Sequence, residues 1–270
     1  MQATDQKNLN FQVIAAKELP GNTGGKPRLV SFYKELKKKR MLRNTAFGKS
    51  LTNAFFLDKD IDDLSRAALR SVHVIYTRTY DLEGDLYVCG DISRAAADAC
   101  GLTLAQVRGI LGDPHTWITR HSQNWIDWTT LCVISQLKQV NPGATFNRLS
   151  EVNVDLLGQV DADAVQNFKT KLTQLLNTSP RAFDSLYLRY RRVIERNIAN
   201  GEPLRFFKGK WLLSIIGKEI TQKNIAPDAQ LQAIGQKITV SLVGQVGNRM
   251  DCQCCARPMQ SIQRLIEGLN

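Results

Sequence analysis

The residues from Ile92 to Leu111, ISRAAADACGLTLAQVRGIL, constrain the fold more tightly than any other stretch of the chain. Two short segments with apolar residues at helical spacing meet at Gly101. Because glycine adopts a left-handed backbone at little cost, this position predicts a tight turn between two helices. Thr103 follows the turn and is a natural N-cap for the second helix. The stretch therefore predicts two packed helices, with the small side chain of Ala97 at their crossing point.

Five further residues of this stretch fall on positions that would face a shared core: Ala96, Cys100, Leu102, Val107 and Ile110. Over about 20 residues the pattern resembles the DNA-binding helix-turn-helix class. The resemblance implies that the second helix lies in the major groove and presents its N-terminal half to base edges. On this sequence the exposed candidates are Thr103, Leu104, Ala105, Gln106 and Arg108. Gln106 would then pair with adenine, Arg108 with guanine, and Leu104 or Ala105 would meet a thymine methyl group.

The flanking segments extend this pattern toward a winged helix. The acidic residues from Asp58 favour a helix over residues 60–80, "DLYVCG" is typical of a short strand, and residues 115–131 resemble a β-hairpin. Residues 29–42 and most of the chain after residue 143 have helical spacing. We therefore expect a mainly α fold with a central winged-helix-like (helix-turn-helix) segment, which carries a short β-hairpin, and a helical C-terminal domain.

Charge is distributed unevenly along the 270 residues, whose net charge is +11. Residues 1–57 carry 11 Lys and Arg against 3 Asp and Glu, residues 58–140 carry 8 against 11, and residues 141–270 carry 17 against 11. We accordingly expect a basic N-terminal arm and helix (1–57), a winged-helix-like segment (58–140) and a helical basic C-terminal domain (141–270). Affinity for nucleic acid comes largely from Lys and Arg on phosphates, so the mild acidity of the central segment counts against DNA contact there.

The basic residues gather in two clusters. The first comprises Lys37, Lys38, Lys39, Arg40 and Arg43, and the second comprises Arg181, Arg189, Arg192 and Arg196. In the second, the arginines form one helical stripe, and Phe183, Tyr187 and Ile194 occupy the opposite face, which suits contact with a phosphate backbone. An ordinary solvated face would explain either cluster alone, and the first could equally serve nuclear import or membrane-surface binding. Together with the net charge, they favour DNA or RNA as a partner.

Patterns that resemble chemical sites are incomplete. "PGNTGGKP" has Pro20 and Pro27 where a phosphate-binding loop needs Gly and Ser or Thr. Cys252, Cys254 and Cys255 could give thiolates to zinc, but a structural zinc site needs four ligands and the last histidine is His121. His73, His115 and His121 share no catalytic spacing, and the acidic runs "DKDIDD" and "DLEGD" fit helix caps and turns. We expect no enzyme, no cofactor and no metal, although metal binding by the three cysteines stays open.

The sequence contains no apolar run of membrane-spanning length and no secretory signal. Its six cysteines suit free thiols in a reducing compartment better than a disulfide framework. We therefore expect an intracellular, cytoplasmic protein without a membrane partner.

These features predict a non-enzymatic nucleic-acid-binding protein. The first hypothesis is a DNA-binding replication or transcription factor that uses the helix-turn-helix at residues 92–111 and the flanking basic helices. The alternative is an RNA-binding nucleoprotein, or a subunit of a ribonucleoprotein complex, that coats single-stranded nucleic acid through a basic groove. Either would fit a homo-oligomer or a larger nucleoprotein complex. A structural adaptor, and an enzyme that uses the cysteines or an acidic cluster with a metal, are the remaining alternatives.

Overall fold

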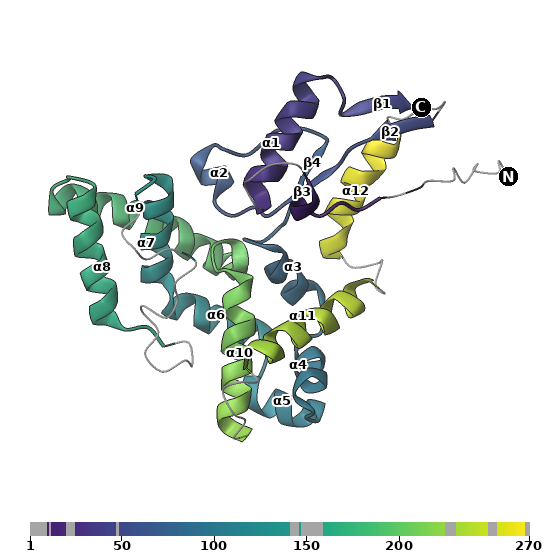
Figure 1. The fold of residues 1–270 in the computed structure, drawn as a ribbon. Helices are drawn as coiled ribbons and strands as arrows, with labels where there is room; N and C mark the ends of the chain where they lie inside the picture. The colour runs from purple at the N-terminus through teal and green to yellow at the C-terminus, as the bar shows by residue number, and fades with distance from the viewer. Residues whose placement is uncertain are drawn as a thin grey trace. The chain divides into compact units, whose positions relative to one another are not determined.

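The computed structural model describes residues 10, 12–19, 25–46, 49–140, 146, 159–224, 231–247 and 253–267. In these residues the fold is mainly helical, with two small two-stranded sheets, so the expected fold class is confirmed at that level (Figure 1). The chain divides into two compact units, described separately below: Met1–Leu57, Ser71–Ile75 and Ile262–Asn270 in unit 1, and Asp58–Arg70 and Tyr76–Ser261 in unit 2. The three-part division expected from charge stays a prediction.

Unit 1 places one amphipathic helix against short strands. Tyr33 and Phe55 are buried and meet edge to face, with ring centroids 5.4 Å apart. The first sheet is an antiparallel hairpin in which Arg43 lies opposite Thr52. The elements in this part of the chain are η1 (Ala16–Glu18), α1 (Gly25–Lys38), β1 (Arg43–Ala46), β2 (Lys49–Thr52), β3 (Phe55–Leu57) and β4 (Val74–Tyr76).

Unit 2 contains most of the helices around one apolar core. In it α11 packs against α4 and α10, and α7 packs against α8 and α9 (Figure 1). The elements are α2 (Asp62–Ser65), α3 (Leu82–Cys89), α4 (Ile92–Cys100), α5 (Leu104–Leu111), α6 (Pro114–Asn124), α7 (Ile126–Leu137), α8 (Ala162–Leu175), α9 (Pro180–Ala199), η3 (Pro203–Arg205), α10 (Gly209–Asn224), α11 (Leu231–Gly247) and α12 (Gln253–Glu267), the last of which continues into unit 1.

The helix pair predicted around Gly101 is present. Gly101 ends α4 with a left-handed backbone (φ +66°), and Thr103 caps α5 through the amide of Gln106. Ala96, Ala97 and Val107 are buried, and Cys100, Leu102 and Ile110 pack against the same core. α11 also packs against α4, and its residues Ile234, Ile238 and Leu242 are buried at four-residue spacing.

The helix expected over residues 60–80 is wrong beyond its first turn. α2 ends where Arg66 adopts a left-handed backbone (φ +57°), and the amides of Ala67 and Ala68 bond back to the carbonyl oxygen of Asp62. The β-branched residues Val74 and Ile75 then form β4, which pairs with β3. Strand pairing within the fold therefore overrides the local helical spacing.

The strand expected at "DLYVCG" is also wrong, because these residues belong to α3. Asp81 caps this helix by accepting a hydrogen bond from the amide of Gly84, and Glu83 and Asp85 lie in the first turn. Acidic side chains stabilise the N-terminal end of a helix through its dipole. The cap therefore decides the structure of a segment that resembles a strand in composition.

The β-hairpin expected in residues 115–131 is replaced by two helices, α6 and α7, which meet at the fully buried Trp125. Asp113 caps α6 and Pro114 occupies its first turn, so the "GDP" that ends α5 also starts the next helix. Trp117, His121 and Trp125 are all buried at four-residue spacing, which is a helical pattern. The flank that a winged helix would fill with a wing hairpin thus consists of two helices, over residues 114–124 and 126–137, with a turn at Trp125.

Candidate nucleic-acid interface

The exposed face of α5 carries the residues that the helix-turn-helix resemblance singles out. Thr103, Ala105, Gln106 and Arg108 are exposed, and Leu104 is half-buried. The helix is thus not enclosed by the protein. Of these side chains, only that of Arg108 is positively charged.

The side chain of Gln106 is already committed within the protein. Its carbonyl oxygen accepts hydrogen bonds from the Thr103 amide (2.9 Å) and the Thr103 hydroxyl (2.8 Å), which completes a capping box. Bidentate recognition of adenine needs both the oxygen and the NH₂ group of a glutamine. Gln106 could pair in this way only if it released the cap, so its role in the structure is to hold the start of α5.

Arg181, Arg189, Arg192 and Arg196 form the second predicted cluster, called here the α9 arginine row. All four are exposed, whereas Phe183, Tyr187, Ile194 and Ile198 are buried on the opposite face. At 100° per residue the four arginines fall within a sector of roughly 80°. The local cause is a well-defined helix, with Ser179 as N-cap, Pro180 in the first turn and Gly201 (φ +77°) directly after the C-cap.

The acidic residues of α9 lie outside the row and have their own partners. Asp184 pairs with Lys169 of α8 at 2.8 Å, and Glu195 pairs with Arg191 at 3.0 Å. Arg191 also reaches Asp127 of α7 at 3.3 Å. In the described part of the chain, no acidic side chain pairs with any of the four arginines of the row. Within the described residues, the row is therefore a surface of positive charge whose guanidinium groups form no ion pair with a carboxylate.

Helix stability does not explain the row fully. Arg181 lies in the first turn of α9, and that turn has no acidic residue. A cation near a helix N-terminus interacts unfavourably with the helix dipole, whereas an external anion would be attracted by both. The position of Arg181 therefore does not stabilise α9 through the helix dipole.

The first predicted cluster has a structural explanation. Lys37 and Lys38 lie in the last turn of α1, where cations favour the helix dipole. Lys39 pairs with Glu35 at 2.6 Å, Arg40 adopts a left-handed backbone (φ +56°), and Arg43 lies in β1. All five are exposed. This cluster belongs to unit 1 and the α9 arginine row to unit 2.

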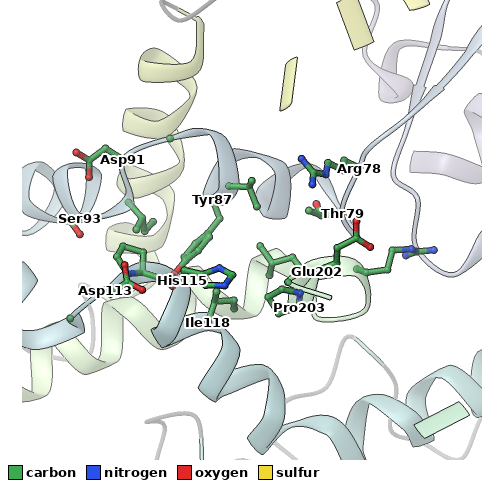
Figure 2. Close-up of a pocket in the computed structure, with 18 of the residues that line it drawn as sticks. Arg78, Thr79, Tyr87, Asp91, Ser93, Asp113, His115, Ile118, Glu202 and Pro203 are labelled. Atoms are coloured by element: carbon green, nitrogen blue, oxygen red, sulfur yellow. Dashed lines mark hydrogen bonds between the residues drawn. The ribbon is translucent and has the colours of Figure 1, made fainter. Parts of the chain in front are cut away.

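A cleft of about 990 Å³ in unit 2 was not predicted from the sequence, although one predicted residue, Arg108, lines it. Its walls come from the segment before α3, the second half of α3, the starts of α4 and α6, Arg108 of α5, and residues 201–205 after α9. Figure 2 shows Arg78 toward one end and Asp91 toward the other, with Tyr87 and His115 between them in this view. No local sequence signal marks these residues, because four separate segments have to come together to form the cleft.

An anchored acidic residue, Asp81, holds the α3 side of the cleft in place. Asp81 is buried and accepts hydrogen bonds from the amides of Gly84 (3.0 Å) and Gly209 (2.9 Å), so one carboxylate ties the start of α3 to the start of α10. Burial and the nearby Glu83 carboxylate raise the pKa of Asp81 to about 6. Next to it, the carboxylate of Asp85 accepts the amides of Arg78 (3.0 Å) and Thr79 (2.8 Å).

The histidines outside the cleft have structural partners. His73 is buried, and its Nδ1 lies 2.8 Å from the carbonyl oxygen of Asn53. His121 is buried against the ring of Trp117, and its Nε2 lies 3.3 Å from the carboxylate of Glu219. Both imidazoles therefore lie against fixed neighbours inside the protein.

The expectation of free thiols is wrong for Cys89, which is disulfide-bonded. Cys100 and Cys132 are free, and burial raises the pKa of both thiols, so neither is an activated nucleophile. The expectation for Cys252, Cys254 and Cys255 falls outside the residues and side chains that the structure describes. A cytoplasmic location stays a prediction.

Among the described helices, none has the length and apolar character that crossing a bilayer requires. Comparison with protein-family models, with curated proteins and with solved structures finds no match to this chain.

Proposed function

We propose that this protein is a non-enzymatic nucleic-acid-binding protein that holds a single strand, RNA or DNA, by its phosphates. The observation that carries the proposal is the α9 arginine row. Four exposed guanidinium groups without an acidic partner among the described residues extend over the sixteen residues of helix from Arg181 to Arg196, a rise of roughly 22 Å. Arginine binds phosphate oxygens through a planar fork of donors, and a row of such groups follows a backbone without reading bases.

The choice of a single strand over a duplex rests on α5 and its surroundings. The amide oxygen of Gln106 is bonded to its own N-cap, Arg108 lies in a cleft with Asp91 and Asp113, and α6 and α7 stand in place of a wing. These features reduce what α5 can read in a major groove. They favour the nucleoprotein hypothesis over the replication or transcription factor.

Sequence-specific DNA binding remains the second candidate, because one observation favours it. Gly101 ends α4 with a left-handed backbone, Thr103 caps α5, and α5 keeps an exposed face, which supports a helix-turn-helix role. In this case Arg108→Ala would reduce discrimination among duplexes by about 1–3 kcal/mol.

The test is salt-dependent binding of matched single-stranded RNA, single-stranded DNA and duplex DNA, measured by fluorescence anisotropy. Replacing the four arginines of the row with glutamine removes up to four phosphate contacts. Each contact on a single strand contributes about 0.7 to the slope of log K against log salt concentration, so the slope should become shallower by about 2.8.

The control variant replaces four other exposed cations with glutamine, namely Arg70, Lys138, Lys237 and Arg264. It removes the same formal charge from scattered positions and should change the slope much less. Equal loss in both variants would mean that net charge alone drives binding, and unchanged binding in the row variant would refute the proposed interface. A strong preference for one duplex sequence, lost in Arg108→Ala, would support the second candidate instead.

A further inference from the structure

The cleft in unit 2 has the size and composition of a ligand site. Its volume of about 990 Å³ lies at the upper end of the range for small-molecule pockets, roughly 300–1,000 Å³. Apolar side chains make up much of the wall, and the remaining wall is polar or charged. The apolar lining residues include Tyr87, Val88, Ile92, Ile118, Pro203 and Leu204.

Two cations of the cleft are available to a ligand. Arg78, in the segment before α3, and Arg108, on α5, are both exposed, and neither makes an ion pair within the described residues. The other two cations are already used, because Lys59 lies 3.8 Å from Asp63 and the buried Arg205 forms a short salt bridge with the same carboxylate. The cleft thus offers two guanidinium groups from two different elements.

Two of the three acidic residues of the cleft serve as helix caps. Asp91 accepts the amide of Arg94 at 3.0 Å, and Asp113 accepts the amide of Thr116 at 2.7 Å. The hydrogen bond from Thr116 lowers the pKa of Asp113, so this carboxylate stays ionised. The third, Glu202, is exposed. The carboxylates at the starts of α4 and α6 would repel a ligand that is anionic over its whole length. The cleft therefore suits a ligand in which the phosphate groups are separated from an uncharged part.

The hydroxyl groups on the apolar side are already bonded. Tyr87 donates its hydroxyl to the carbonyl oxygen of Pro114 (2.7 Å), and the Thr79 hydroxyl bonds to the carboxylate of Asp85 (2.8 Å). His115 is exposed and lines the same cleft as Tyr87 and Ile118 (Figure 2). An uncharged ring would therefore be held by packing against this wall more than by hydrogen bonds to these hydroxyls.

We propose that the cleft holds one nucleotide of a bound single strand, its base against the apolar wall and its flanking phosphates on Arg78 and Arg108. This inference rests on the proposed function and names the part of the ligand that enters the protein. A nucleotide inside a strand has a phosphate on each side, which matches two cations on separate elements better than a free nucleotide does. Arg196, the last residue of the α9 arginine row, also lies only five residues before Gly201, which lines the cleft. A strand held by the row would therefore pass close to the cleft.

The experiment uses the full chain and a short oligouridylate that carries a single 4-thiouridine. After irradiation at long wavelength, mass spectrometry identifies the cross-linked peptides in wild type, in Arg78→Gln/Arg108→Gln, and in the matched double variant Lys138→Gln/Lys237→Gln. We expect cross-links within residues 78–93 or 113–118 in wild type, and a loss of about tenfold or more in the cleft variant only. Overall affinity should fall much less, because the row still holds the strand.

Parallel titrations with free uridine monophosphate and with inorganic phosphate separate the alternatives. If the strand binds but cross-links lie elsewhere, or persist unchanged in the cleft variant, the inference is wrong and the proposed function stands. If the strand does not bind wild type at all, both are wrong. Tight binding of free uridine monophosphate without strand binding would mean that the cleft binds a free nucleotide. An affinity for inorganic phosphate equal to that for uridine monophosphate would mean that the cleft is only an anion site. Each of these last two results overturns the inference.

Discussion

The junction between α3 and α10 allows a sharp test through Gly209→Ala. A Cβ atom at residue 209 would lie 2.1 Å from the backbone nitrogen of Gly84, 2.5 Å from Oδ1 of Asp81 and 2.6 Å from the carbonyl carbon of Glu83. Two of these atoms belong to the backbone of the first turn of α3 and cannot rotate away. The start of α10 must therefore withdraw, which weakens the hydrogen bond from the Gly209 amide to Asp81.

Two costs add in this variant. Overpacking of a tight contact costs about 1–3 kcal/mol. A weakened hydrogen bond to a buried carboxylate costs about 1.5–3 kcal/mol more. We therefore expect Gly209→Ala to lower the free energy of unfolding by about 2.5–6 kcal/mol, measured by urea denaturation followed by circular dichroism and tryptophan fluorescence.

The matched control is Gly109→Ala in α5. A Cβ atom there meets no heavy atom within 4 Å, and the residue lies inside a helix. This variant should leave the free energy of unfolding unchanged or raise it by up to about 1 kcal/mol, since alanine favours helix more than glycine does. A Gly209→Ala protein within about 1 kcal/mol of wild type would refute the close α3–α10 contact.

Three further predictions concern the turn and two carboxylates. Gly101→Ala should lower the free energy of unfolding by about 1–2 kcal/mol in the same urea experiment. The left-handed backbone at φ +66° is unfavourable for alanine, even though its Cβ would meet no neighbour. An unchanged free energy of unfolding would contradict the turn. The pKa of Asp81 is raised from 3.8 to about 6, so the folded state binds more protons than the unfolded state in that window. Unfolding free energy should fall as pH rises from 3.8 to 6, by up to about 3 kcal/mol from this group, and Asp81→Asn should flatten the profile; a profile that the variant leaves unchanged would argue against this shift. For Glu219, burial acts to raise the pKa, but hydrogen bonds from His121 and Trp117 outweigh it and lower the pKa below 4.5. Its contribution to stability is present above pH 4.5 and lost as pH falls through the folded pKa, so Glu219→Gln should reduce stability most near neutral pH and least in acid, as measured by thermal unfolding at several pH values.

Local signals in the sequence predicted the parts of the fold that depend on neighbouring residues. The glycine at 101 and the threonine at 103 define the α4–α5 turn, because a left-handed backbone and a side-chain cap are local properties. The same holds for α9, whose cap, proline and arginine spacing predicted both the helix and its exposed charged face.

Predictions failed where capping or pairing with a distant segment decided the structure. Residues 74–76 form a strand because β3 offers a partner, and residues 82–89 form a helix because Asp81 caps it and reaches Gly209. The helices at 114–137 were missed although Trp117, His121 and Trp125 carry the helical spacing, because tryptophan and isoleucine also favour strands.

The sequence by itself therefore determined a mainly helical protein with a glycine-centred helix pair and an arginine-faced helix, since caps, turns and periodicity act over a few residues. Only the tertiary structure decided that the Gln106 side chain is used in a cap, that the acidic residues of α9 pair away from its arginines, and that Arg78 and Arg108 line one cleft. The physical reason is that the cleft is lined by residues that are far apart in the sequence, between 59 and 205. Contacts over such distances produce no periodic pattern of residues from which they could be predicted.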